Sequence, residues 1–217
     1  MEALEWIDLG TMAYLDAWER QRETAREVLE RRAASPLHRV LLVEHPHVYT
    51  LGKNGNEANM LAPGGVTLVR VDRGGDVTYH GPGQLVVYPV IDLASTGSGA
   101  RAYVEWLEEI VTRVIARHGI TGERLPGATG VWVEPSGSRP RKICAIGIKC
   151  SRGVTTHGFA LNVNTDLDYF KRVNPCGFAD KGVTSIAREL GREVAMESVK
   201  AAVREEFEER WHLIHEK

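Results

Sequence analysis

Residues 142–163, KICAIGIKCSRGVTTHGFALNV, decide the fold class of this 217-residue chain. Their two apolar runs, 142–149 and 154–163, flank Arg152-Gly153, a pair that favours a tight turn. These runs therefore predict two antiparallel strands joined as a hairpin. A turn-rich stretch separates the hairpin from Val131-Trp132-Val133, which predicts a further strand.

Extended segments also fill the part of the chain before this hairpin. Apolar runs at residues 40–43, 66–71 and 85–91 predict strands, and residues 45–52 predict a turn and a second extended piece. The segment 73–84 is rich in glycine and too long for a minimal hairpin turn. Glycines let a backbone approach a ligand closely or direct N–H groups at an oxygen. A purely structural loop explains this segment equally well.

Helical spacing of apolar residues occurs over residues 11–32, 104–119 and 196–214, and Gly119 suits the left-handed position after a helix. Helices at both ends and strands in the middle predict an α+β fold. We expect a single domain, residues 1–217, with helices packed on a mixed or largely antiparallel sheet. A dinucleotide-binding fold is excluded because the glycines at 74, 75, 81 and 83 do not match G-x-G-x-x-G.

Composition limits the partners and the compartment. The formal net charge of −2 gives no electrostatic reason to expect nucleic acid as a ligand. No run of about 18 apolar residues predicts a membrane span. The first residues lack the positive and apolar regions of a signal peptide. We expect a cytoplasmic protein.

Three cysteines, Cys144, Cys150 and Cys176, form an odd set in a chain without an export signal, which argues against a disulfide framework. Cys144 and Cys150 are six residues apart and lack the C-x-x-C spacing of a structural zinc site. We therefore expect free thiols and no metal.

Cys176 is the candidate nucleophile. It lies between Pro175 and Gly177, which favour an exposed turn, and a helical pattern begins soon afterwards at residues 183–190. A cysteine attacks as its thiolate, which a positive charge or a helix N-terminus stabilises. From the residues alone, an unreactive cysteine buried in a loop is the more common case.

Lys142 is the candidate partner of that thiol. The period of two places Lys142, Cys144, Ile146 and Ile148 on one face of a strand, and a lysine is unusual there. Its ammonium group can stabilise a thiolate or transfer a proton, or it can simply mark the exposed start of the strand. His157 is a further polar candidate, although a lone histidine is more often structural.

Eleven short blocks occur in order between about residues 40 and 190, and together they resemble the lipoyl(octanoyl) transferases. No single block is sufficient, but the ordered set is specific. The blocks are Glu44-His45-Pro46, Tyr49-Thr50-Leu51-Gly52, Arg73-Gly74-Gly75, Thr78-Tyr79-His80-Gly81-Pro82-Gly83-Gln84, Tyr88-Pro89, Lys142-Ile143, Ala145-Ile146-Gly147, His157-Gly158, Ala160-Leu161-Asn162-Val163, Pro175-Cys176-Gly177 and Val183-Thr184-Ser185.

The resemblance implies a fold similar to the catalytic domains of biotin and lipoate protein ligases. It also implies that Cys176 forms an acyl-thioester and that Lys142 stabilises its thiolate or serves as acid and base. Cys144 stands where alanine is common in that family. The implied acyl-binding residues are Arg73, Gly74, Gly75, Asp76, Val77, Thr78, Tyr79, His80, Ala145, Ile146, Gly147, Gly158, Phe159 and Ala160, with His157 as a supporting residue.

The implied reaction moves an octanoyl or lipoyl group from the phosphopantetheine arm of acyl carrier protein to a lysine. That lysine belongs to a lipoyl domain of a 2-oxoacid dehydrogenase E2 subunit or to the glycine-cleavage H protein. Neither ATP nor a metal is required. Two alternatives stay open: an ATP-dependent lipoate protein ligase, which leaves the Pro-Cys-Gly turn without a role, and an inert acyl-binding protein.

Overall fold

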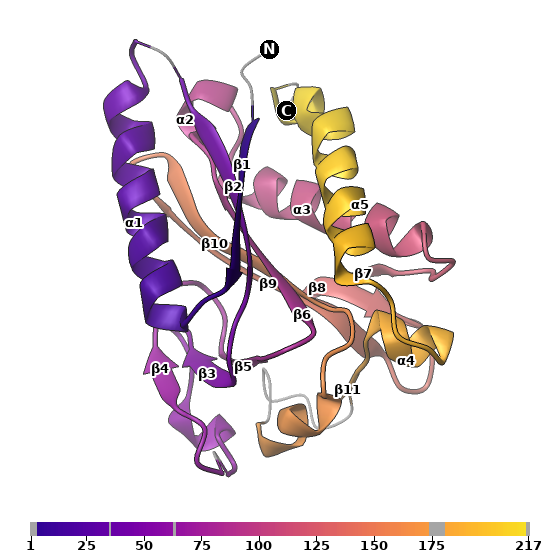
Figure 1. Ribbon diagram of the computed structural model, residues 1–217. Helices are drawn as coiled ribbons and strands as arrows, with labels where there is room; N and C mark the ends of the chain where they lie inside the picture. The colour runs from indigo at the N-terminus through magenta and orange to yellow at the C-terminus, as the bar shows by residue number, and fades with distance from the viewer. Residues whose placement is uncertain (1–3, 35, 63, 174–180, 216–217) are drawn as a thin grey trace.

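The computed structural model describes residues 4–34, 36–62, 64–173 and 181–215 (Figure 1). Its centre is an eight-stranded sheet. Along the sheet the strands are β1 (Leu4–Thr11), β2 (His38–Glu44), β6 (Gln84–Val90), β10 (Val154–Asn162), β9 (Arg141–Ser151), β8 (Ala128–Val133) and β7 (Glu123–Leu125), and β11 (Gly182–Val183) pairs with β9. The β1–β2 and β9–β11 pairs are parallel and the others are antiparallel, so the predicted mixed sheet is confirmed.

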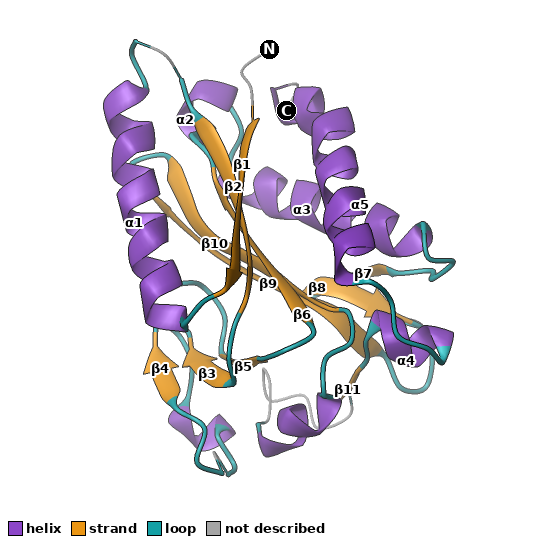
Figure 2. Ribbon diagram, in the orientation of Figure 1, coloured by secondary structure: helices purple, strands orange, loops and turns teal. Residues whose placement is uncertain are grey.

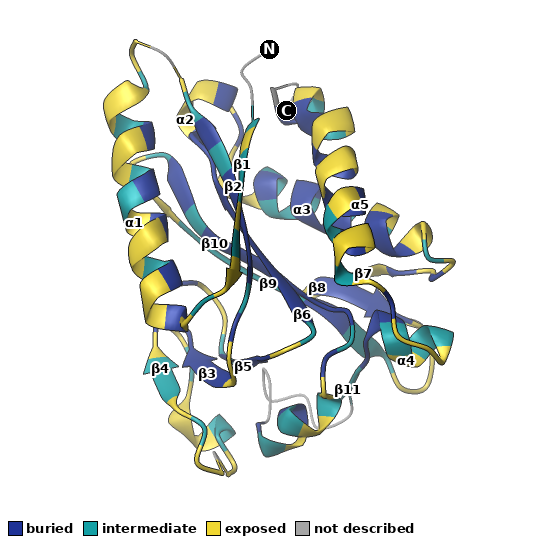
Figure 3. Cartoon of the chain, viewed as in Figure 1, coloured by how far each residue is buried: buried dark blue, intermediate teal, exposed yellow. Residues whose placement is uncertain are grey.

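Helices cover both faces of this sheet. In Figure 2, α1 (Tyr14–Arg31) lies on one side, and α3 (Ala100–Ala116) and α5 (Met196–Arg210) lie on the other. The helices are buried toward the sheet and exposed away from it (Figure 3). Each face has its own apolar core. Short helical elements complete this part of the fold: α2 (Leu93–Thr96), α4 (Ile186–Leu190), η2 (Leu167–Arg172) and η4 (Trp211–His215).

A smaller three-stranded sheet lies at one end of the molecule (Figure 1). It consists of β4 (Leu68–Arg70), β3 (Val48–Leu51) and β5 (Val77–His80), and η1 (Glu57–Asn59) follows β3 in the chain. Part of the glycine-rich segment therefore forms a strand, β5. The segment is also tied to the large sheet, because the Gly74 amide donates a hydrogen bond to the Ile148 carbonyl oxygen of β9 at 2.9 Å.

Most of the predicted elements are confirmed, including the hairpin between β9 and β10. Helix α3 ends at Ala116, three residues before the predicted end at Gly119, which has the expected left-handed φ of +77°. Strand β1 was not predicted. Leu4 and Trp6 pack against one core while Ile7 and Leu9 pack against the other, so the strand lacks a simple alternation of apolar and polar residues.

A bulge in β9 corrects one prediction. The cross-strand pairs with β8 change from Val131–Cys144 to Trp132–Lys142, which leaves one extra residue on β9. Ile143 and Cys144 are therefore both fully buried in the core that contains α3 and α5, whereas Lys142 lines a cavity. The prediction that Lys142 and Cys144 share a face is wrong.

Within the described ranges, no helix combines the length and the apolar character that crossing a bilayer requires.

Candidate active site

A cavity of about 530 Å³ lies where the glycine-rich segment meets β9 and β10. Both apolar and polar side chains line it, which is typical of small-molecule sites. All but one of the described residues named above for the site line this cavity: Lys142, Arg73, Gly74, Gly75, Asp76, Val77, Thr78, His80, Ala145, Ile146, Gly147, His157, Gly158, Phe159 and Ala160.

Tyr79 of β5 is the exception, because its fully buried ring is held by contacts outside the cavity. Its ring packs in a separate apolar cluster with Tyr49 and Phe170 and stacks on Tyr169 with ring centroids 4.8 Å apart. Its hydroxyl group lies 2.6 Å from Nδ1 of His47. Tyr79 therefore supports the wall behind the cavity instead of lining it.

Glycine is required where the glycine-rich segment crosses β9. A Cβ atom on Gly147 would lie 2.9 Å from the Gly74 carbonyl oxygen and 3.2 Å from Cδ of Arg73. Arg73 is itself buried, and its guanidinium group donates to the carbonyl oxygens of Gly74 and Thr50 and to the Thr50 hydroxyl group. Arg73 thus holds the segment in place.

Two buried imidazoles support the cavity: His80, which lines it, and His45, which lies behind its wall. His80 Nδ1 donates to Gln84 Oε1 at 2.8 Å, since the Gln84 amide nitrogen already donates to the Tyr79 carbonyl and to Asn162. His80 Nε2 therefore accepts from the Thr50 hydroxyl group at 3.3 Å. Burial lowers the pKa of His80 well below its usual value, so this ring is neutral.

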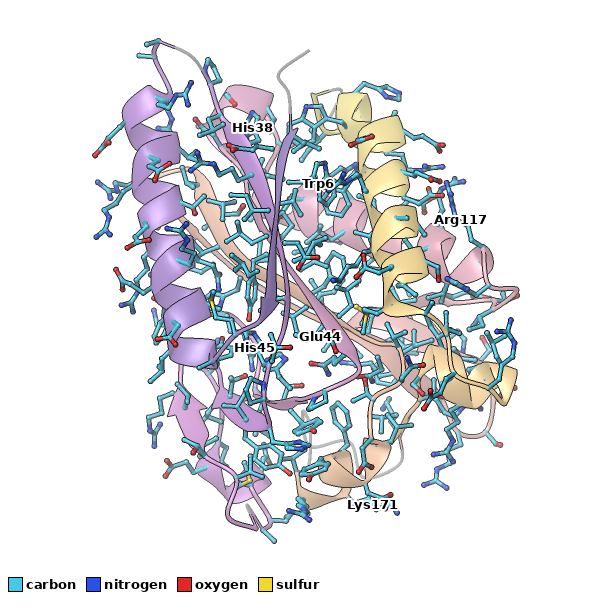
Figure 4. All side chains as sticks on the ribbon, viewed as in Figure 1. Trp6, His38, Glu44, His45, Arg117 and Lys171 are labelled. Carbon is cyan, nitrogen blue, oxygen red and sulfur yellow. The ribbon has the colours of Figure 1, made fainter. Side chains whose placement is uncertain are left out.

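His45 is the second neutral ring. Its Nδ1 donates to the Met12 carbonyl oxygen and its Nε2 accepts from the Tyr88 hydroxyl group, both at 2.8 Å. Figure 4 shows His45 beside the N-terminal end of α1, where its ring lies 5.1 Å from that of Tyr14. Burial lowers the pKa of His45 from 6.5 to about 4. Because Tyr14 and Tyr88 line the cavity, His45 anchors its floor.

His157 combines three unusual features. Its φ of +58° is left-handed, a conformation that costs a side-chain-bearing residue about 1–2 kcal/mol. Its Nε2 lies 2.8 Å from Asp72, whose other carboxylate oxygen lies 2.6 Å from Lys149 Nζ. Burial lowers the pKa of His157 to about 4, against the raising effect of Asp72. Its buried Nδ1 has no hydrogen-bond partner among the residues that the structure describes.

Lys142 of β9 lines the cavity beside the adjacent strand β8. Its Nζ donates to the Thr129 carbonyl oxygen at 3.0 Å and lies 4.7 Å from the centroid of the Trp132 ring. A carbonyl oxygen and an aromatic face both favour the charged ammonium group. Lys142 is thus a fixed positive charge on the cavity wall.

Cys176 lies outside the described residues. The next described residues along the chain, Lys181, Gly182 and Val183, all line the cavity. Of the other thiols, Cys150 is exposed and Cys144 is buried, and burial raises the pKa of the Cys144 thiol, so Cys144 is unreactive. The described ranges contain no group of three or more His, Cys, Asp or Glu side chains that could hold a metal ion.

Sequence reasoning missed several residues that line the cavity. Gln84, Tyr88 and Asn162 stand inside the blocks quoted above, so their positions carried a signal that was not used. Tyr14 and Trp132 carried none, because one lies in a helix with a surface pattern and the other in a short strand.

Comparison with known proteins identifies relatives that match most of the chain. Residues 13–208 match the family described as Lipoyl protein ligase A/B catalytic domain. An octanoyltransferase from Bacteroides fragilis strain YCH46 is 52% identical over 201 residues, which cover 89% of this chain and 91% of that protein. An octanoyltransferase from Chloroflexus aggregans is 48% identical over 206 residues, which cover 92% of this chain and 90% of that protein.

Solved structures show the same fold at low sequence identity. A bipartite lipoate protein ligase from Thermoplasma acidophilum superposes with a TM-score of 0.71 at 18% identity and covers 98% of this chain and 85% of that one. A biotin protein ligase from Aquifex aeolicus gives a TM-score of 0.51 at 12% identity and covers 100% of this chain and 72% of that one. The expected similarity to lipoate and biotin ligases is confirmed for the fold.

Proposed function

We infer the reaction from one premise: the chain belongs to the lipoyl protein ligase A/B catalytic domain family and is an acyltransferase of the octanoyltransferase kind. It transfers octanoyl groups in protein lipoylation. The donor that we propose is octanoyl-acyl carrier protein, and the acceptor is a lysine on the lipoyl domain of an E2 subunit or on the glycine-cleavage H protein. A single catalytic domain in the cytoplasm performs the transfer without ATP or a metal.

The observation that carries this proposal is that Lys142 lines a cavity of about 530 Å³ whose wall includes the apolar side chains of Val86, Ile146 and Ile148. Residues 145–148 of β9 line that cavity over about 10 Å. An extended octanoyl chain is roughly 8 Å long from its carbonyl carbon to its methyl carbon, because its seven bonds advance about 3.3–3.6 Å for every three bonds. At about 0.8 kcal/mol per buried methylene, the alkyl chain contributes roughly 5 kcal/mol to binding.

Cys176 is the proposed acyl carrier. It is five residues from Lys181, so covalent geometry keeps their Cα atoms within about 18 Å of each other. Lys181 lines the cavity, and so does Lys142. A thiolate within reach of the Lys142 ammonium group is stabilised as a nucleophile.

The proton balance assigns two steps to Lys142. In the first, the Cys176 thiolate attacks the octanoyl thioester, the phosphopantetheine thiolate leaves, and Lys142 gives it a proton. In the second, the acceptor ε-amine attacks the new thioester, and Lys142 takes a proton from that nitrogen as Cys176 leaves as its thiolate. The enzyme regains its starting state, and an amide replaces a thioester.

Three single variants test the proposal in an assay of octanoyl transfer from acyl carrier protein to a lipoyl domain. Cys176→Ala should abolish transfer, and Lys142→Ala should reduce it at least a hundredfold, typical of a lost acid–base group. Cys144→Ala is the matched control, because that thiol is buried away from the cavity. Full activity of Cys176→Ala, or a requirement for ATP, would exclude the thioester route and favour a ligase.

A further inference from the structure

We propose that Trp132 is the positioning residue of Lys142: its ring, together with the Thr129 carbonyl group, forms a cradle that keeps Lys142 charged and directed at the cavity. This role rests on the proposed function of Lys142. Trp132, a residue of β8, would not contact the reacting bonds. It would set the protonation and the position of Lys142, which takes part in the reaction.

The first half of the cradle is the aromatic face. Trp132 and Lys142 are direct cross-strand partners beside the β9 bulge, and the ammonium nitrogen lies 4.7 Å from the ring centroid. The ring is 2% exposed, and its Nε1 donates to the Ala128 carbonyl oxygen at 2.8 Å. Because this hydrogen bond and the surrounding packing hold the indole ring, its face stays turned to the ammonium group and the cation–π contact is fixed.

The second half is a carbonyl group that a buried carboxylate helps to direct. Glu108 of α3 accepts a hydrogen bond from the Gly130 amide at 2.9 Å. Gly130 has a φ of +122°, and a Cβ atom there would lie 2.4 Å from the Cys144 carbonyl oxygen, so only glycine fits. The register between β7 and β8 shifts around Gly130, and the carbonyl oxygen of the preceding residue, Thr129, lies 3.0 Å from Lys142 Nζ.

Both halves present partial negative charge, so they stabilise an ammonium group relative to an amine. The charge matters at the start of the reaction, when Lys142 must stabilise the thiolate and hold a proton for the leaving thiol. If the cradle is weakened, the Lys142 ammonium group loses its proton at a lower pH. The alkaline limb, which is the pH range over which the rate of the first acyl transfer declines, then lies at lower pH.

The most direct test replaces Trp132 alone by tetrafluorotryptophan, which keeps the ring's shape and removes most of its electron-rich character. Acylation of Cys176 by octanoyl-acyl carrier protein is followed by mass spectrometry across pH. We expect the alkaline limb to lie about one pH unit lower, so that above the limb the acylation rate is about tenfold lower while the rate below the limb is nearly unchanged. An unmoved limb would overturn the proposal.

The same replacement in a Lys142→Ala background separates the cradle from a general packing effect. With no ammonium group to hold, the fluorinated ring should change the remaining rate less than twofold, as expected for two coupled residues. An equal tenfold loss there would show that Trp132 acts by shaping the cavity, and the proposal would be wrong. Full activity of Lys142→Ala alone would instead refute the proposed function.

Substitution of Trp132 by standard amino acids provides a second test. Trp132→Phe keeps an aromatic face and should stay within about threefold of the wild-type rate, whereas Trp132→Leu should lose about tenfold or more. Thermal unfolding of both variants shows whether they fold. Equal rates for folded Phe and Leu variants would rule out a role for the aromatic face.

Discussion

The neutral state of His45 predicts a specific sensitivity to acid. The pKa of His45 is about 4 in the folded protein and 6.5 in its ordinary environment, so between these values the unfolded chain binds the proton more readily. The stabilisation of the folded protein that comes from a neutral His45 is fully present above pH 6.5 and is lost as the pH falls toward 4. From pH 8 to pH 5 the loss for one such histidine is about 2 kcal/mol.

His45→Gln removes that titration. The Gln side chain can still accept from the Tyr88 hydroxyl group but cannot also donate to the Met12 carbonyl, so a constant loss of about 1 kcal/mol is expected at every pH. Urea unfolding at pH 8 and pH 5 gives the free energy of unfolding of each protein. Between those pH values, the variant should lose about 2 kcal/mol less than the wild type, whatever its absolute stability.

Replacement of the exposed His212 by Gln is the matched control and should leave the wild-type loss unchanged. His157, whose pKa is also about 4, continues to titrate in every variant and contributes a similar loss of its own. If the wild type and His45→Gln lose equal stability between pH 8 and pH 5, then His45 is not held neutral by burial, and the description of the cavity floor is wrong.

Three further substitutions test other parts of the structure. Gly147→Ala should raise the KM for the octanoyl donor about tenfold, because overpacking against the Gly74 carbonyl costs about 1–3 kcal/mol; Gly99→Ala, with no atom within 4 Å of the new Cβ, should leave KM unchanged. Arg32→Ala should lower the free energy of unfolding by about 3 kcal/mol, since it removes the paired guanidinium group from the buried carboxylate of Asp92; loss of the exposed Arg101–Glu105 pair by Arg101→Ala should cost less than about 1 kcal/mol. Cys144→Ala should lower the free energy of unfolding by about 1–2 kcal/mol while kcat is unchanged, and a drop in kcat would place that thiol in the chemistry.

The sequence predicted most of the elements that position the cavity, because their apolar spacing matches their final environment. The β9–β10 hairpin follows from two apolar runs around Arg152-Gly153, and Gly119 has the predicted left-handed backbone shortly after α3. Local pattern and tertiary structure agree at these places. The resemblance to the lipoyl(octanoyl) transferases, and not local pattern, pointed to the three segments that line the cavity.

The side-chain directions at the site were less predictable. A one-residue bulge near Ile143 separates Lys142 from Cys144, and no local composition marks that bulge. Tyr79 was included in a continuous acyl-binding stretch, yet its fully buried ring packs in a separate apolar cluster and does not line the cavity. Trp132 reads as one core residue of a short strand, and only the pairing of β8 with β9 brings its ring to Lys142.

The central claim is that Cys176 carries the octanoyl group, and one measurement tests it directly. The Cys150→Ser protein, which lacks the exposed competing thiol, is mixed with octanoyl-acyl carrier protein in the absence of acceptor and ATP, then digested and weighed by mass spectrometry. We predict one octanoyl group on the peptide that contains Cys176. If a lipoyl domain is added before digestion, the octanoyl group should instead be found as an amide on that domain. An unmodified Cys176 peptide, in a preparation that still octanoylates the lipoyl domain, would contradict it.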